Sequence, residues 1–196
     1  MPGIRGVVAT LLALSVAGAV VSAARPVRGG VEGSPRQSAG ARPARSAATR
    51  AISRSTPHLK FTATISAAVI VPGSRMSIAV DVVPKKGMHV YAPGTKYRPV
   101  KIAVEADPLL RVHDPVYPKP AHYLFKPLNE DVLVYDTPFR LVVDFIAGDS
   151  DAVRAQLRNR TQMIIRATLD YQACDDRLCY LPASVPFQWT MRVAGD

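Results

Sequence analysis

The sequence has little cysteine and tryptophan, and it lacks the short motifs that mark common classes of enzyme. Its 196 residues include only two cysteines and one tryptophan. Nothing in it resembles the nucleophile elbow of serine hydrolases or a glycine-rich phosphate loop, so hydrolase and nucleotide chemistry have no support. No long apolar run occurs after residue 24, so no transmembrane span is expected in that part of the chain.

The one long apolar run lies at the N-terminus and has the pattern of an export signal. Arg5 precedes an uncharged stretch from Val7 to Val21, and small residues follow at positions 22–24. This order is typical of a secretory signal peptide, which we predict for residues 1–24. The run is close to the length of a membrane span, so an uncleaved N-terminal anchor is the alternative. The protein is therefore expected to be periplasmic or otherwise exported, either free or tethered by this segment.

Residues 25–57 differ in composition from everything that follows. They are rich in Arg, Ala, Pro, Ser and Gly and contain almost no aromatic or large aliphatic side chains, so we predict a disordered linker. Residues 1–57 carry eight arginines and one acid, Glu32, and so supply most of the formal net charge of +10. Export argues against a nucleic-acid partner, whereas a basic linker is expected to have a weak attraction to anionic membrane surfaces.

Residues 58–196 are expected to form one domain, and its hydrophobic pattern has a period of two. Apolar and polar side chains alternate in its longer segments, as in half-buried β-strands. Only Asp149–Arg158 has a helical pattern, with Asp149 or Ser150 as its N-cap. Many short strands separated by turns predict an all-β domain, an immunoglobulin-like β-sandwich. The candidate strands are residues 61–67, 76–83, 89–91, 101–105, 132–135, 139–145, 163–171 and 185–193.

Both cysteines lie in one short segment, YQACDDRLCYLP, at residues 171–182. The segment connects two predicted strands, so Cys174 and Cys179 are expected at one end of the sandwich, and an exported pair can form a disulfide. As a structural staple it would contribute little, because closing about six residues stabilises by roughly 2 kcal/mol, against nearly 5 kcal/mol for a long loop. Reversible thiol–disulfide exchange needs two close thiols and a reachable sulfur, which an edge loop provides.

A metal site is the third interpretation of the cysteine pair. Two thiolates would need further ligands, and His89, His113 and His122 are the candidates. Their spacing matches no diagnostic ligand pattern, and neither a metal nor another cofactor is predicted. On the residues alone, the staple, the exchange pair and the metal site stay open.

The same segment resembles the N-terminal periplasmic domain of the thiol:disulfide interchange protein DsbD. The resemblance rests on the pattern Tyr-Gln-x-Cys…Cys-Tyr-x-Pro and on residues 71–94 and 132–145, and it extends over residues 59–193. It implies an immunoglobulin-like sandwich that exchanges electrons with periplasmic thioredoxin-fold partners, as a protein-disulfide reductase or thiol–disulfide oxidoreductase does. It also implies that Cys179 forms the mixed disulfide with a partner and that Cys174 resolves it.

The resemblance further implies a mobile cap loop over the cysteines, for which residues 117–131 are the candidate. We predict Phe125 as the tip of this cap, with Tyr123 or His122 beside it, because an apolar lid would shield a dithiol until a partner displaces it. An ordinary long loop with packed aromatic residues is the alternative. The predicted walls of the site are Tyr135, Tyr171 and Tyr180, and Tyr91 is a further tyrosine that could lie near the cysteines.

Two features depart from the family pattern. Four residues separate the cysteines here, where the family often has five. The family protein continues into a membrane-spanning conduit and a thioredoxin-like domain, whereas this sequence ends at Asp196, so a separate electron donor is expected. If the exchange interpretation fails, the alternative is a non-enzymatic envelope binding module that keeps the disulfide as a staple.

Overall fold

The computed structural model describes residues 50–105 and 107–194. The predicted signal peptide, residues 1–24, and the linker up to residue 49 lie outside the described residues. Within the part of the chain that the structure describes, no helix is long and apolar enough to cross a membrane.

Residues 50–57, which composition assigned to the linker, belong to the folded domain instead. β1 (Arg50–Ser55) pairs antiparallel with β2 (Leu59–Ile65) at the edge of a sheet. The Trp189 indole donates a hydrogen bond of 2.9 Å to the Arg50 carbonyl, and Ile52 packs against the core. Because β1 is mostly exposed, strand pairing and these tertiary contacts hold it in place. Local composition carries no sign of either.

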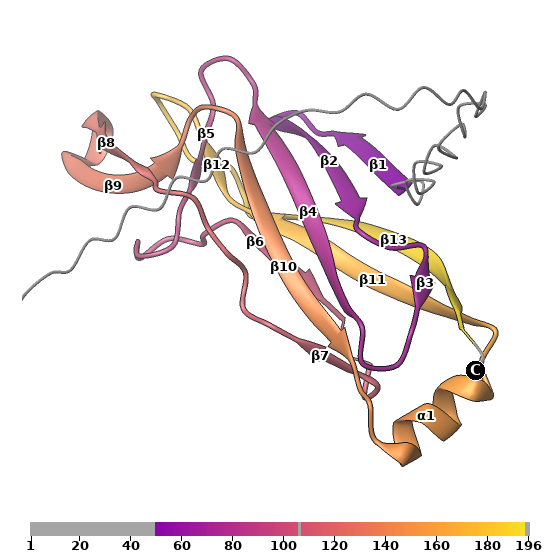
Figure 1. Cartoon of the computed structure of the whole chain (residues 1–196). Helices are drawn as coiled ribbons and strands as arrows, with labels where there is room; N and C mark the ends of the chain where they lie inside the picture. Colours follow the sequence, from indigo (N-terminus) through magenta and orange to yellow (C-terminus); the bar gives the residue numbers. More distant parts are fainter. Residues whose placement is uncertain (1–49, 106, 195–196) are drawn as a thin grey trace, which may run out of the picture. The chain divides into compact units, whose positions relative to one another are not determined.

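Two sheets pack face to face and form an immunoglobulin-like β-sandwich, which confirms the predicted fold class (Figure 1). One sheet has the strand order β1-β2-β4-β10-β7, and the other has the order β3-β13-β11-β6. The long neighbouring strands pair antiparallel, while the short β3 pairs in parallel with β13. The remaining strands of these sheets are β3 (Val69–Ile70), β4 (Arg75–Pro84), β6 (Lys101–Val104), β7 (Leu110–Val112), β10 (Phe139–Ala147), β11 (Gln162–Tyr171) and β13 (Ala183–Val193).

The period of two seen in the sequence is the alternation of buried and outward-facing side chains along the long strands. Every second residue of β10 and β11 is buried, and residues from both sheets form one continuous core. Phe61 of one sheet packs against Phe187 of the other, with ring centroids 5.6 Å apart, and Phe187 packs edge-on against Trp189. Each sheet has one apolar face, and packing the two faces together covers both.

A third, smaller sheet forms one end of the domain, with the strand order β12-β5-β9-β8. One of its faces contributes Val90, Tyr135 and Ala173 to the main core. The other face carries a separate small cluster of buried side chains that includes Cys174. The strands are β5 (His89–Tyr91), β8 (Ala121–Phe125), β9 (Glu130–Tyr135) and β12 (Ala173–Cys174).

The segment predicted as a cap loop, residues 117–131, is in large part a β-hairpin. β8 and β9 pair antiparallel, and a short 3-10 helix, Lys126–Leu128, lies between them. Asn129 follows this helix with a φ of 52°, a left-handed conformation that asparagine tolerates better than most residues. The cap is thus attached to the third sheet through β9 and carries its side chains at fixed strand positions.

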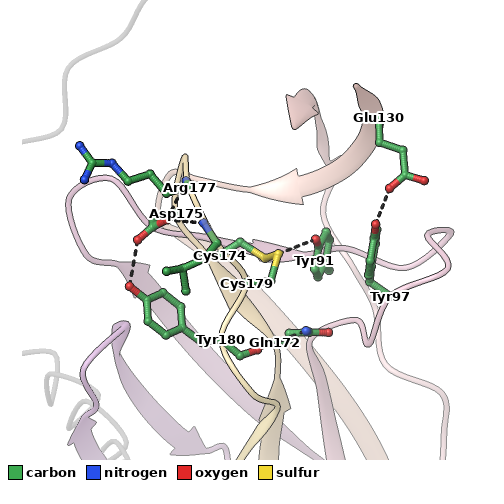
Figure 2. The surroundings of a disulfide bond; sticks show 10 residues. Tyr91, Tyr97, Glu130, Gln172, Cys174, Asp175, Arg177, Cys179 and Tyr180 are labelled. Atoms are coloured by element: carbon green, nitrogen blue, oxygen red, sulfur yellow. Dashed lines mark hydrogen bonds between the residues drawn. A yellow bond between two sulfur atoms is a disulfide. The ribbon is translucent and has the colours of Figure 1, made fainter. Parts of the chain in front are cut away.

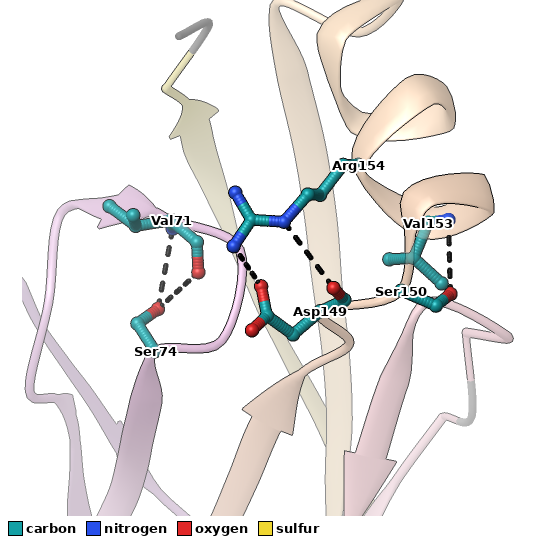
Figure 3. A network of polar contacts seen from close by, with 6 residues as sticks. All are labelled: Val71, Ser74, Asp149, Ser150, Val153 and Arg154. Carbon is teal, nitrogen blue, oxygen red and sulfur yellow. Dashed lines mark hydrogen bonds and ion pairs between the residues drawn. The ribbon is translucent and has the colours of Figure 1, made fainter.

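The one α-helix of the described residues lies at the other end of β10 from the third sheet (Figure 1). α1 (Asp151–Arg158) begins after Ser150, whose side chain accepts a hydrogen bond from a first-turn amide, so Ser150 is the N-cap. Asp149 pairs with Arg154 beside it (Figure 3). The neighbouring turn requires Gly73, because its φ is +75° and a Cβ there would lie 3.2 Å from the Asp149 carboxyl carbon.

Candidate functional site

The two cysteines face each other across a tight hairpin. Cys174 and Cys179 form an antiparallel bridge and are joined by a disulfide, with their Cα atoms 4.0 Å apart (Figure 2). A backbone hydrogen bond of 2.9 Å from Tyr180 to Ala173 and another of 3.0 Å across the turn hold the hairpin on either side of the bridge. Backbone hydrogen bonds as well as the disulfide thus join the two arms of the hairpin.

Asp175 organises the turn between the cysteines. One carboxylate oxygen accepts hydrogen bonds of 2.8 Å from the amides of Leu178 and Arg177, and the other accepts one of 2.9 Å from the Tyr180 hydroxyl. The two backbone bonds, followed by the hydroxyl bond, hold the pKa of Asp175 below its usual value. The same contact raises the pKa of Tyr180. Tyr180, predicted as a wall of the site, thus supports the turn that carries the cysteines.

The two cysteines differ in their accessibility. Cys174 is fully buried, with 0 % of its surface exposed, whereas Cys179 is half-buried. Two exposed apolar side chains flank Cys179 in the sequence: Leu178 is 49 % exposed and Leu181 is 88 % exposed. Of the two cysteines, only Cys179 is thus partly open to solvent, and exposed apolar side chains lie next to it in the sequence.

Tyr91 contacts the disulfide through its hydroxyl group. Its hydroxyl lies 3.1 Å from the Cys179 sulfur, and because a disulfide sulfur has no proton, the hydroxyl is the donor (Figure 2). Burial, followed by the neighbouring Tyr97 and Glu130, raises the pKa of Tyr91 to about 12. The hydroxyl therefore keeps its proton at neutral pH and can donate to a disulfide sulfur or to a thiolate at Cys179.

A polar contact chain extends from Tyr91 to the cap hairpin. The Tyr91 ring stacks on Tyr97 with centroids 4.4 Å apart, and the Tyr97 hydroxyl donates a hydrogen bond to Glu130 at the start of β9. Glu130 also pairs with Lys96, and Lys96 and Tyr97 together lower its pKa. Because these contacts join the segment after β5 to the cap, they hold the cap hairpin against the cysteine end of the domain.

The cap hairpin brings two of its predicted residues to the cysteines. Phe125 is 5 % exposed and packs in the same small cluster as Cys174 and Tyr91. Tyr123, two residues earlier on the same face of β8, is partly buried against this cluster, as is Cys179. Val132 and Val134 of β9 complete the cluster. The cluster is separate from the main core, and it forms an apolar environment around the disulfide.

His122 is not brought to the cysteines. His122 is the second residue of β8 and lies on the strand face opposite to that of Tyr123 and Phe125. Its side chain is 75 % exposed, and its Nδ1 atom lies 2.9 Å from a carboxylate oxygen of Asp131. Successive side chains of a strand point to opposite faces, so a strand that turns Tyr123 inward must turn His122 outward. The prediction of a loop could not distinguish these two neighbours, whereas the strand does.

Tyr135 and Tyr171 belong to the main core and not to the cluster around Cys174. Tyr135 stacks on Phe139, and its hydroxyl donates a hydrogen bond of 2.8 Å to the Pro118 carbonyl. The Tyr171 hydroxyl donates to the Thr56 side chain at 2.8 Å. In β9, Tyr135 follows a residue of the small cluster, Val134, so alternation directs it to the other face of the third sheet. Tyr135 therefore lies on the main-core side of the third sheet, and Tyr171 packs in the main core.

Sequence reasoning missed the contacts of His89, Tyr97 and Glu130. His89 lies opposite Cys174 in the ladder between β5 and β12, and the period of two that places Tyr91 beside the cysteines also places His89 there. Tyr97 follows β5 in a loop, where no periodicity predicts its neighbours. Among the described residues, the histidines and cysteines form no group of three or more metal-ligating side chains.

Comparison with known proteins finds a family match over the part of the chain that contains both cysteines. The family model "Thiol:disulfide interchange protein DsbD, N-terminal" matches residues 59–188, which include the cap hairpin and both cysteines. No curated protein matches the chain. Among solved structures, the N-terminal periplasmic domain of ScsB from Proteus mirabilis aligns at 15 % identity and a TM-score of 0.47, covering 71 % of this chain. The chain spans about half of that structure, 49 % of its length.

Proposed function

Because the chain belongs to the family of the N-terminal domain of the thiol:disulfide interchange protein DsbD, we propose that Cys174 and Cys179 are a working redox pair. The pair exchanges electrons with thioredoxin-fold partners in the periplasm, to which the signal peptide predicted at residues 1–24 directs the protein. The observation that carries the proposal is the unequal exposure of the two cysteines: Cys179 is half-buried and Cys174 is fully buried beside it.

The exchange proceeds through a mixed disulfide at Cys179. A partner thiolate attacks the Cys179 sulfur, the bond to Cys174 breaks, and the electron pair of that bond leaves on Cys174. The partner's second thiolate then attacks the partner sulfur of the mixed disulfide, and Cys179 leaves with the second electron pair. The partner ends as a disulfide and the domain as a dithiol. The two protons released by the partner thiols are taken up by the two cysteines.

The reverse reaction uses the same groups. The Cys179 thiolate attacks a partner disulfide, and Cys174 attacks Cys179 to release the partner as a dithiol. The Tyr91 hydroxyl, 3.1 Å from the Cys179 sulfur, is placed to stabilise the Cys179 thiolate in both directions. The relative reduction potentials of the partners set the net direction of electron flow.

The cap hairpin is the second part of the proposal. Phe125 and Tyr123 pack against the cluster that contains Cys174, and they leave Cys179 only half-buried. A partner that docks over the cysteines displaces this apolar contact and replaces it with its own surface. The cap side chains partly shield the dithiol from small oxidants. A partner gains access because its own apolar surface replaces the apolar contact that the cap makes with the cluster.

The reduction potential of the disulfide tests whether the pair is a redox pair or a structural staple. We expect the full chain to equilibrate with thiol buffers at a potential above about −300 mV, because structural disulfides in secreted proteins typically lie below that value. Alkylation of free thiols followed by mass measurement reports the reduced fraction in a series of buffers, and a double Cys174→Ser, Cys179→Ser variant provides the blank. A lower potential, together with resistance to a reduced thioredoxin-fold protein, would identify a staple and refute the proposal.

The exposed leucines beside Cys179 provide a test of partner docking. We expect Leu181→Asp to slow reduction of the disulfide by a reduced thioredoxin-fold protein several-fold and to leave its reduction by a small dithiol unchanged, because only the protein needs the apolar surface. Val71→Asp is the matched control: Val71 is also an exposed apolar residue, at 44 %, but it lies in the turn near α1 (Figure 3). Equal effects of the two variants would contradict docking at the leucines.

A further inference from the structure

His89 is a buried polar side chain with an unused hydrogen-bonding atom next to the redox pair. The residue is 3 % exposed, and its Nε2 atom has no hydrogen-bond partner among the described residues. Its ring lies 4.3 Å from that of Tyr123, centroid to centroid, and edge-on to that of Tyr91 at 6.2 Å. Buried polar atoms are nearly always paired, so an unpaired one in this position calls for an explanation.

The strand register places His89 opposite Cys174. The two residues are direct partners in the antiparallel ladder of β5 and β12. Side chains of directly opposed residues lie on the same face of a sheet, with Cβ atoms about 4.5–5.5 Å apart, which is within reach of an imidazole and a sulfur. The face is that of the small cluster, because Ala173 and its partner Val90 both belong to the main core.

Opening the disulfide leaves a buried sulfur without a hydrogen-bond donor, and His89 can provide one. Once the bond to Cys179 breaks, Cys174 holds a negative sulfur in a site with 0 % exposure, where water cannot solvate it. The Tyr91 hydroxyl is already engaged with Cys179. Among the polar side chains of the cluster face, His89 is the one with an unpaired buried nitrogen.

We propose that His89 is the hydrogen-bond donor to Cys174: when the disulfide opens, the Nε2–H group of His89 donates to the released Cys174 sulfur and stabilises it as a thiolate. The inference rests on the proposed redox function and assigns a separate task to each of two neighbouring residues. Tyr91 serves the sulfur that a partner reaches, and His89 serves the sulfur that stays buried. In the oxidised state Nε2 has no partner because Cys174 is neutral and bonded to Cys179.

The surroundings of His89 favour a neutral imidazole that donates one proton. Burial is the largest influence and lowers the pKa of His89, while Asp136 and Asp175 act in the opposite direction. The groups that face it from the packed elements are Tyr91 of β5, Tyr123 of β8 and Cys174 of β12. With no cation among these groups, a thiolate at Cys174 depends on a neutral donor, which the Nε2–H tautomer provides.

The pKa of the Cys174 thiol tests this role. In the full chain carrying Cys179→Ser, we expect His89→Phe to raise the pKa of Cys174 by about one unit or more, because a donor to the thiolate is lost while the ring is kept. His89→Gln retains an N–H group at a similar reach and is expected to restore part of the difference. Ultraviolet absorbance of the thiolate as a function of pH gives the value for each variant.

His58→Phe is the matched control. The Nδ1 atom of His58 is also buried and unpaired, and its ring packs 4.4 Å from that of Tyr180, but it does not face Cys174. We expect this variant to leave the Cys174 pKa unchanged. If His89→Phe and His89→Gln lower the unfolding temperature and leave the Cys174 pKa unaltered, His89 has only a packing role and the inference is wrong.

A measurement on the unaltered chain covers the case in which His89 variants do not fold. The NMR signal of the His89 Nε2 nitrogen is expected to shift on reduction and to titrate together with Cys174, whereas the His58 signal does not respond. An unchanged His89 signal overturns the inference even if exchange with partners is intact. A chain whose disulfide cannot be reduced by thiols fails at the proposed redox function instead, so the two failures are distinguishable.

Discussion

Replacing Cys179 with alanine is expected to abolish the mixed disulfide between this domain and a thioredoxin-fold partner, whereas Cys174→Ala is expected to make that complex accumulate. The asymmetry follows from burial. Cys179 is half-buried and can be attacked, while Cys174, at 0 % exposure, takes part only through its bond to Cys179. Without Cys174 no internal thiol resolves the complex, so its lifetime rises by orders of magnitude.

The experiment uses a partner with a single reactive cysteine, supplied as a mixed disulfide with thionitrobenzoate. The Cys179 thiolate attacks the partner sulfur and thionitrobenzoate leaves as the thiolate, and the partner has no second thiol to resolve the complex. Non-reducing gel electrophoresis after rapid acid quenching measures the amount of complex formed by each full-chain variant. A Cys174→Ala, Cys179→Ala double variant sets the background. If both single variants form equal amounts of complex, or if Cys174→Ala forms none while Cys179→Ala does, the assignment of the two roles is wrong.

The second large effect is expected from Phe125→Ala, which should speed the reaction of the reduced pair with a bulky thiol reagent by about tenfold. Phe125 is 5 % exposed in the cluster with Cys174, so its ring supplies much of the apolar contact that keeps the cap in place. A loss of about 1.4 kcal/mol in the free energy of cap closure corresponds to a tenfold rise in the open population. A small reagent, which needs less opening, is expected to show a smaller gain.

The same strand supplies the matched control for the cap. Leu124 precedes Phe125 but is 53 % exposed on the outer face of β8, so Leu124→Ala removes a similar apolar side chain without touching the cluster. We expect its reaction rate to equal that of the unaltered chain. Equal rates for Phe125→Ala and the unaltered chain would show that the ring does not control access. Circular dichroism of the oxidised variants confirms that the sandwich stays folded, as expected because the cluster is separate from the main core.

Several features of the fold were predictable because they depend on local periodicity. The alternation in residues 139–145, 163–171 and 185–193 indicated strands with one buried face, and β10, β11 and β13 include these segments. Asp149 and Ser150 were both candidates for the helix cap from the local pattern, and the structure selects Ser150. Strand alternation and helix caps can be recognised from a few neighbouring residues. The folded core buries the same side chains that the alternation predicts to be buried.

The site was predictable in part. The cysteine spacing and the flanking motif identified the pair. Phe125, predicted as the tip of a cap, packs in the cluster that contains Cys174, and its role in controlling access stays a prediction. The tyrosines were not separable by sequence, because Tyr91 and Tyr135 both lie in strands of the third sheet and only the register decides which face each occupies. Tyr135 supports the main core, while Tyr91 contacts the Cys179 sulfur.

By itself, the sequence determined the all-β class of the domain, the positions of its long strands and the pairing of its two neighbouring cysteines as the candidate site, since each of these depends on the order of nearby side chains. Tertiary structure alone decided that residues 50–55 form a strand, that residues 121–135 form a hairpin, that Cys174 is buried while Cys179 is half-buried, and that His89 faces Cys174. The physical reason is that strand pairing joins residues far apart in the chain. A shift of one residue in the pairing of a strand would direct all of its side chains, such as those of Cys174 and His89, to the opposite face of the sheet.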